Sequence, residues 1–181
     1  MNAEKAYELS AAYGEWISQN DYDLAMCLRL KKTPSPLASS AAAEAARIAL
    51  SEKVRELFGN AENIAFGKTK KGAYRRKLYK RNPKFHIHRV VSIELDEDGM
   101  GFHAHLLVKK FDGWSHKQMI ELLYELWKEL NNTATLTKGE FWGEPLESKR
   151  GSSVYITKDA HKQEALLVDG IDLWSSFISK P

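Results

Sequence analysis

The sequence predicts an α+β fold with a central antiparallel β-sheet and helices packed on one face. Apolar and polar residues alternate over residues 90–95 and 102–108, on either side of Asp98-Gly99, a dipeptide typical of tight β-hairpins. Residues 116–130 instead carry apolar side chains at helical spacing. Strands are therefore interspersed with helices around an obvious hairpin, which favours a sheet covered by helices.

The N-terminal part of the chain is predicted to contain two helices and two strands. Residues 2–19 read as a short amphipathic helix, and residues 23–30 alternate as a strand. Residues 38–58 are rich in alanine and predict a helix that Gly59-Asn60 ends. A short strand is expected near residues 63–66.

The remaining elements follow from the same patterns. A hairpin is expected within residues 85–110, and Ser115 is placed to cap the helix over residues 116–130. Residues 134–142 predict another strand. A last helix, capped by Ser152 or Ser153, is expected to run to about Leu167.

Length and composition indicate one intracellular domain. A chain of 181 residues is long enough for one core and short for two, so we expect a single domain over residues 1–181. Its core is expected at about 22–167, with a docking tail at 168–181. Cys27 is the only cysteine, which excludes a disulfide framework and favours a reducing compartment. With no signal peptide and no membrane-length apolar run, we expect a soluble, cytoplasmic protein without a membrane partner.

Positive charge is concentrated in one segment although the net charge is only +3. The segment contains nine lysines and arginines and no acid, with aromatic residues interleaved. Such a pattern predicts phosphate contacts and base stacking, although a solvated basic loop is the plainer alternative. The predicted DNA-binding residues of this segment are Lys68, Lys70, Lys71, Arg75, Arg76, Lys77, Lys80, Arg81 and Lys84.

The predicted hairpin brings together three metal-ligating side chains. His103 and His105 are two residues apart in an apolar strand and share the face opposite its apolar residues. If Asp98-Gly99 is a two-residue loop, Glu94 lies directly opposite His103. Two imidazoles and a carboxylate with further positions open are typical of a catalytic metal site on the solvent face of the hairpin.

Two further groups of residues bear on this site. Tyr155 and Lys158 are i, i+3 neighbours on the last predicted helix, with Lys162 one turn further on, and an ammonium beside a tyrosine favours its phenolate. Alone, Tyr155 is more simply a half-buried helix residue. His86 and His88 form a second His-x-His pair, but His88 is expected opposite Lys109, about 13 Å along the strand from His105. They are therefore not expected to bind the same ion.

Together these residues resemble the HUH endonucleases, specifically the nuclease domain of rolling-circle replication initiators. The resemblance rests on the His103–His105 strand, the upstream Glu94 and the later Tyr155 and Lys158, and it covers roughly residues 22–162. It implies an RRM-like or ferredoxin-like fold. It also implies that the triad holds Mn²⁺ or Mg²⁺. The tyrosine is implied to cut one DNA strand, leaving a 5′-phosphotyrosine and a free 3′-hydroxyl.

The resemblance also implies partners. The substrate would be single-stranded or hairpin-extruded DNA at a replication origin. A host or replicon helicase is expected to act beside this nuclease domain. The basic segment would grip flanking DNA, with Lys109 and Lys162 as added phosphate contacts.

Two alternatives remain open at the level of the sequence. A transposase or a mobilisation relaxase of the same superfamily would use the same chemistry in another biological role. A non-catalytic RRM-like nucleic-acid-binding module would account for the basic segment and its aromatic residues, but not for Glu94 facing His103 and His105.

Overall fold

The computed structural model describes residues 15, 19–31, 39–66, 86–96, 101–146 and 176. Within these ranges two helices alternate with four strands in the order βαββαβ. Their bounds are β1 Leu24–Arg29, α2 Ser40–Ala65, β2 Arg89–Leu95, β3 Phe102–Val108, α4 His116–Leu130 and β4 Phe141–Pro145.

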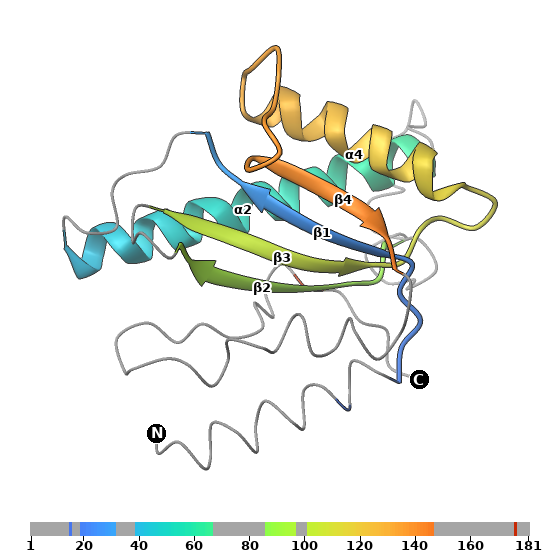
Figure 1. Cartoon of the computed structure of the whole chain (residues 1–181), viewed down its shortest axis with the longest axis horizontal. Helices are drawn as coiled ribbons and strands as arrows, with labels where there is room; N and C mark the ends of the chain where they lie inside the picture. The colour runs from blue at the N-terminus through green and yellow to red at the C-terminus, as the bar shows by residue number, and fades with distance from the viewer. Residues whose placement is uncertain are drawn as a thin grey trace, which may run out of the picture.

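The four strands form one antiparallel sheet in the order β2-β3-β1-β4 (Figure 1). Both helices lie on the same face of this sheet (Figure 1). This element order and strand order are those of the ferredoxin-like arrangement. The predicted α+β class, with helices on one face, is therefore confirmed.

The register of the β2–β3 hairpin is the one that a two-residue loop requires. Glu94 is paired with His103, and the Asp96 N–H donates to the Gly101 carbonyl at 2.9 Å. The loop at 97–100 lies outside the described residues. Because side chains alternate along a strand, this register decides which side chains of β2 share a face with the two histidines.

The core lies between the sheet and the helices. Side chains of one parity on every strand are buried there, including Leu28 of β1, Ile93 of β2 and Leu106 of β3. Trp127 of α4 is fully buried, and its indole N–H donates to the Glu140 carbonyl at 3.0 Å. Since a buried indole needs an acceptor, this bond fixes α4 against the start of β4.

Helix α4 has the predicted bounds and the predicted cap. The Ser115 hydroxyl accepts from the Gln118 backbone N–H, and the Gln118 side chain accepts from the Ser115 N–H at 2.9 Å. This reciprocal capping box satisfies two backbone donors that a helix start leaves open.

Helix α2 is longer than the sequence indicates, so the predicted stop at Gly59-Asn60 and the predicted strand at 63–66 are wrong. The helix runs on to Ala65, and Gly59 does not have a positive φ. Phe58 and Ala61, on either side of the glycine, are fully buried. Burying a side chain such as Phe58 stabilises by about 1.5–3 kcal/mol, which outweighs the cost of a helical glycine of about 1 kcal/mol.

The last described strand also begins later than predicted. Residues 134–140 are not part of a strand and end in a turn at 138–140, and β4 covers Phe141–Pro145. The Thr137 N–H donates to the Glu140 carboxylate at 2.7 Å, and the Phe141 N–H donates to the Thr137 carbonyl. The Glu140 carbonyl then accepts from the Arg29 N–H of β1 at 3.0 Å, and the paired register with β1 begins at Phe141.

The sequence predicted that the second face of the sheet is open to solvent, and this prediction is wrong. Val90 and Leu107 are fully buried on that face and Ala25 is buried beside them, with Trp142 packed against the same cluster. The prediction failed because alternation shows only that two faces differ. It does not show that the second face meets water.

The outer edge of the sheet is contacted by a residue from the predicted tail. The Val91 N–H of β2 donates to the Ser176 hydroxyl at 3.0 Å, which satisfies one donor on the outer edge of the sheet. The predicted helices over 2–19 and 152–167 lie almost wholly outside the described residues. Within the described ranges, neither helix is both long and apolar enough to cross a membrane.

Candidate metal centre

Glu94, His103 and His105 converge as the register predicts, and the three can supply ligand atoms within 4.8 Å of one another. The two Nε2 atoms are 2.9 Å apart, and the imidazole rings meet edge to face. Oε2 of Glu94 lies 3.4 Å from Nε2 of His105 and 3.7 Å from Nε2 of His103. Two neighbouring strands thus direct one carboxylate oxygen and two ring nitrogens at one point.

These distances fit ligands that share one ion. Two donor atoms at about 2.1 Å from a metal lie about 3.0 Å apart at a right angle and about 3.4 Å apart at the tetrahedral angle. The observed separations are 2.9, 3.4 and 3.7 Å. A hydrogen bond between the imidazoles would account for the first distance alone. The carboxylate oxygen close to both nitrogens favours a shared cation.

Asp96 and Arg29 extend the triad into a hydrogen-bonded chain. Oδ1 of Asp96 lies 2.7 Å from Nδ1 of His103 and 2.7 Å from an Nη atom of Arg29. An ionised carboxylate only accepts, so Nδ1 of His103 carries the proton and Nε2 presents its lone pair to the triad. Carboxylates hold metal-ligating histidines in this way, and Arg29 holds the carboxylate in turn.

Burial lowers the pKa of His103 below its ordinary value, and the nearby His105 acts in the same direction. The hydrogen bond to Asp96 opposes this shift without overcoming it. His103 is consequently neutral at pH 7. A neutral imidazole is the form that ligates a metal.

The triad is mostly buried, which corrects its predicted place on a solvent face. The Glu94 and His105 side chains are 7% and 6% exposed, while that of His103 is 18% exposed. A ligand would therefore reach the triad from the His103 side. Ser92, also buried, donates from its hydroxyl to Oε1 of Glu94 over 3.4 Å and leaves Oε2 toward the histidines.

The second His-x-His pair is separate from the triad, as predicted. The Lys109 N–H donates to the His88 carbonyl at 2.9 Å, which places these residues across from each other at the far end of the hairpin. Nδ1 of His86 lies 3.2 Å from the Glu62 carboxylate of α2. His86 thus takes part in a contact between α2 and the segment before β2.

Most of the other predicted site residues fall outside the described part of the chain. This holds for Tyr155, Lys158 and Lys162, and for the basic segment from Lys68 to Lys84. Lys109 is described and lies beside His88. The positions of Tyr155 and Lys158 relative to the triad therefore stay predictions.

Asp96 and Arg29 are the site residues that the sequence reading did not find, although both carry a signal. Asp96 is two residues from Glu94, so its side chain lies on the same face of the strand. In the sequence, however, Asp96 is more readily assigned to the Asp-rich turn that follows. Arg29 is the one charged residue in an otherwise apolar stretch from Leu24 to Leu30. Comparisons with family models, with curated proteins and with solved structures gave no match to this chain, so the case for the site rests on its geometry.

Proposed function

We propose that this protein is a divalent-metal-dependent nuclease that nicks and rejoins one DNA strand through a covalent tyrosine intermediate. In this role it would start rolling-circle replication of a plasmid, phage or viral replicon. The convergence of Glu94, His103 and His105 on a ferredoxin-like sheet carries the proposal. Three protein ligands with further positions open are typical of catalytic metal sites, whereas structural sites are closed.

Each residue of the centre has a distinct role in this proposal. Glu94, His103 and His105 would hold the ion, and Asp96 orients His103 toward it. When bound, the ion supplies Lewis-acid stabilisation of charge on the phosphate and on the leaving oxygen. Mixed nitrogen and oxygen donors bind Mn²⁺ more tightly than Mg²⁺, although the cell offers both.

The covalent step is assigned to Tyr155. Its phenolate oxygen attacks the phosphorus, the bond from phosphorus to the 3′-oxygen breaks, and that oxygen takes up a proton to leave a 3′-hydroxyl. The new bond is a 5′-phosphotyrosine, and attack by a 3′-hydroxyl reverses the step and rejoins the strand. Lys158 favours the phenolate by its charge. The basic segment from Lys68 to Lys84 binds flanking DNA, and a helicase from the host or replicon acts beside the nuclease.

The test is formation of a covalent protein–DNA adduct. The protein is incubated with Mn²⁺ and a pool of single-stranded and hairpin DNA, and adducts are scored on a denaturing gel. Tyr155→Phe should abolish the adduct, and His103→Ala should abolish it by removing a ligand. Tyr124→Phe, which removes a hydroxyl from α4, is the matched control and should behave as the wild type.

The outcomes separate the proposal from its rivals. An adduct that survives in Tyr155→Phe would assign the nucleophile to another residue. Loss of every adduct, with Mn²⁺ and DNA still bound, would indicate a non-catalytic binding module. A transposase or relaxase would also form the adduct, so replication of a plasmid carrying the cleaved sequence distinguishes an initiator from these.

A further inference from the structure

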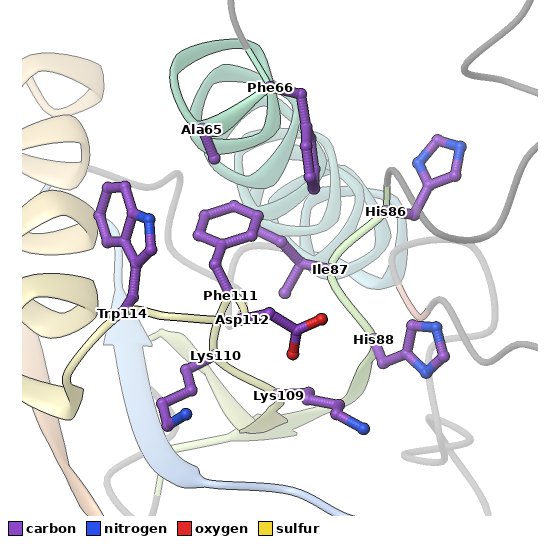
Figure 2. Close-up of a pocket in the computed structure, with 10 residues that line it drawn as sticks. All are labelled: Ala65, Phe66, His86, Ile87, His88, Lys109, Lys110, Phe111, Asp112 and Trp114. Carbon is purple, nitrogen blue, oxygen red and sulfur yellow. The ribbon is translucent and has the colours of Figure 1, made fainter.

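A cavity of about 440 Å³ lies at the end of the hairpin away from the triad (Figure 2). Its lining comes from the end of α2, the residues before β2 and the segment joining β3 to α4. Small-molecule sites occupy roughly 300–1,000 Å³, so the cavity is large enough for one nucleotide. Figure 2 shows aromatic side chains along one side of it and basic side chains along the other.

The aromatic side is a connected set of three rings. Phe66 and Trp114 each pack against Phe111, with ring centroids 5.2 and 5.4 Å apart and edge-to-face geometry. Phe111 is buried and holds the other two in place. Fixed aromatic rings beside a cavity suit a planar ligand, because a base can stack on them.

The basic side is fixed by backbone hydrogen bonds. The Lys109 N–H donates to the His88 carbonyl, and the Lys110 N–H donates to the Asp23 carboxylate at 3.0 Å. Burial lowers the pKa of His88, and the charges of Lys109 and His86 add to that effect. The ammonium groups of Lys109 and Lys110 place positive charge on this side of the cavity, which favours an anionic group there.

Asp112 argues for a nucleotide over a bare anion. Its exposed carboxylate lines the same cavity, between Phe111 and Lys109 in Figure 2. An ionised carboxylate would repel inorganic phosphate, but it accepts hydrogen bonds from the exocyclic amino group of a base such as cytosine. The rings and the carboxylate suit a base and the lysines suit its phosphate, so the lining matches a nucleotide better than it matches phosphate alone.

The cavity and the triad lie at separate places along the same hairpin. Lys109 follows β3 and has the same parity as His105, which is four residues, or about 13 Å, away. Buried Val90 and Leu107 lie between the two places, so they are distinct sites.

We propose that this cavity binds one nucleotide of the single-stranded DNA that flanks the cleaved phosphate. The base lies against the aromatic side near Asp112, and its phosphate contacts Lys109. The identity of the ligand rests on the proposed nuclease function, while the presence of a nucleotide site does not depend on catalysis.

The experiment measures binding of a fluorescein-labelled oligodeoxycytidine by anisotropy, in EDTA so that the triad holds no ion. Lys109→Ala should weaken binding about ten-fold and reduce the salt slope by about 0.7, the value for one lost phosphate contact to a single strand. Lys117→Ala, at an exposed lysine on α4, is the matched control and should leave both values unchanged. Asp112→Asn should reduce the preference for oligodeoxycytidine over oligodeoxythymidine.

Two further results decide the proposal. The proposal is overturned if Lys109→Ala and Lys110→Ala both bind DNA as tightly as the Lys117→Ala control. This result counts only if the circular dichroism spectra of both variants match that of the wild type. Adduct formation is scored separately on the wild-type protein. Weaker binding by Lys109→Ala without any wild-type adduct would retain the nucleotide site and reject the nuclease.

Discussion

At the scale of single residues, two His-x-His pairs look alike in the sequence but differ in the carboxylates that they contact. His103 and His105 face Glu94, and His103 is held by Asp96. His86 instead contacts Glu62, a helix residue that also accepts from the Ile87 N–H at 2.9 Å. Among the described residues, the first pair is the one that shares a carboxylate between both rings, so that pair forms the candidate metal centre.

The first prediction concerns the histidines. His105→Ala removes one of three ligands and should abolish Mn²⁺ binding measured by isothermal titration calorimetry. His88→Ala, at the second pair, should bind Mn²⁺ as the wild type does. Equal loss in both variants would mean that the ion binds elsewhere or through unspecific contacts.

The second prediction concerns the support of His103. Asp96→Asn keeps the shape of the side chain but loses the charge that fixes the tautomer, and it should weaken Mn²⁺ binding about 10- to 100-fold. Glu144→Gln alters an exposed carboxylate on β4 and should have no effect. An unchanged affinity in Asp96→Asn would remove Asp96 from the centre and leave its pairing with Arg29 as a purely structural contact.

At the scale of elements, α2 is long enough for its last turns to contact the edge strand of the sheet. Its last turns bring Glu62 to Arg89, a cation that is buried at the start of β2 and lies over the Phe58 ring. Burial lowers the pKa of Arg89 to about 10 despite the carboxylate. A helix ending at Gly59 would leave this buried cation without its ion pair, which is costly.

The third prediction uses the glycine inside α2. A Cβ at Gly59 would meet nothing within 4 Å, so Gly59→Ala should raise the free energy of unfolding by about 0.4–1 kcal/mol in urea titrations. Gly113→Ala is the contrasting variant, because Gly113 has a φ of +79° and should lose stability on substitution. Destabilisation by Gly59→Ala would mean that α2 does not run through residue 59.

At the scale of the whole molecule, the sheet is buried on both faces. The helical face holds the larger core, and the second face holds a smaller cluster around Val90 and Leu107 next to the metal centre. Because these buried side chains exclude water, charge interactions at the triad are stronger than they would be in solvent. The same burial limits approach to the side of His103.

The fourth prediction tests this two-sided burial. Leu106→Ala and Leu107→Ala remove neighbouring, fully buried side chains from opposite faces. Each should cost about 2–5 kcal/mol of unfolding free energy, because each leaves a cavity. A loss well below 1 kcal/mol in Leu107→Ala alone, measured by chemical denaturation, would show that the second face is open.

Local patterns in the sequence determined the hairpin, α4 and the triad. Alternation in 90–95 and 102–108, with Asp98-Gly99 between them, fixes the parity of Glu94 and His103, since side chains alternate strictly along a strand. The Ser115 cap and the apolar stripe after it likewise define α4 without reference to distant residues.

Tertiary structure alone decided the end of α2, the start of β4, the burial of the second face and the participation of Arg29 and Asp96. Gly59 stays helical because Phe58 and Ala61 are buried against other elements, an energy that local propensity does not contain. Arg29 reaches Asp96 because β1 inserts beside β3, far from the hairpin in sequence. Periodicity shows which side chains share a face, but only the packed chain determines what that face contacts.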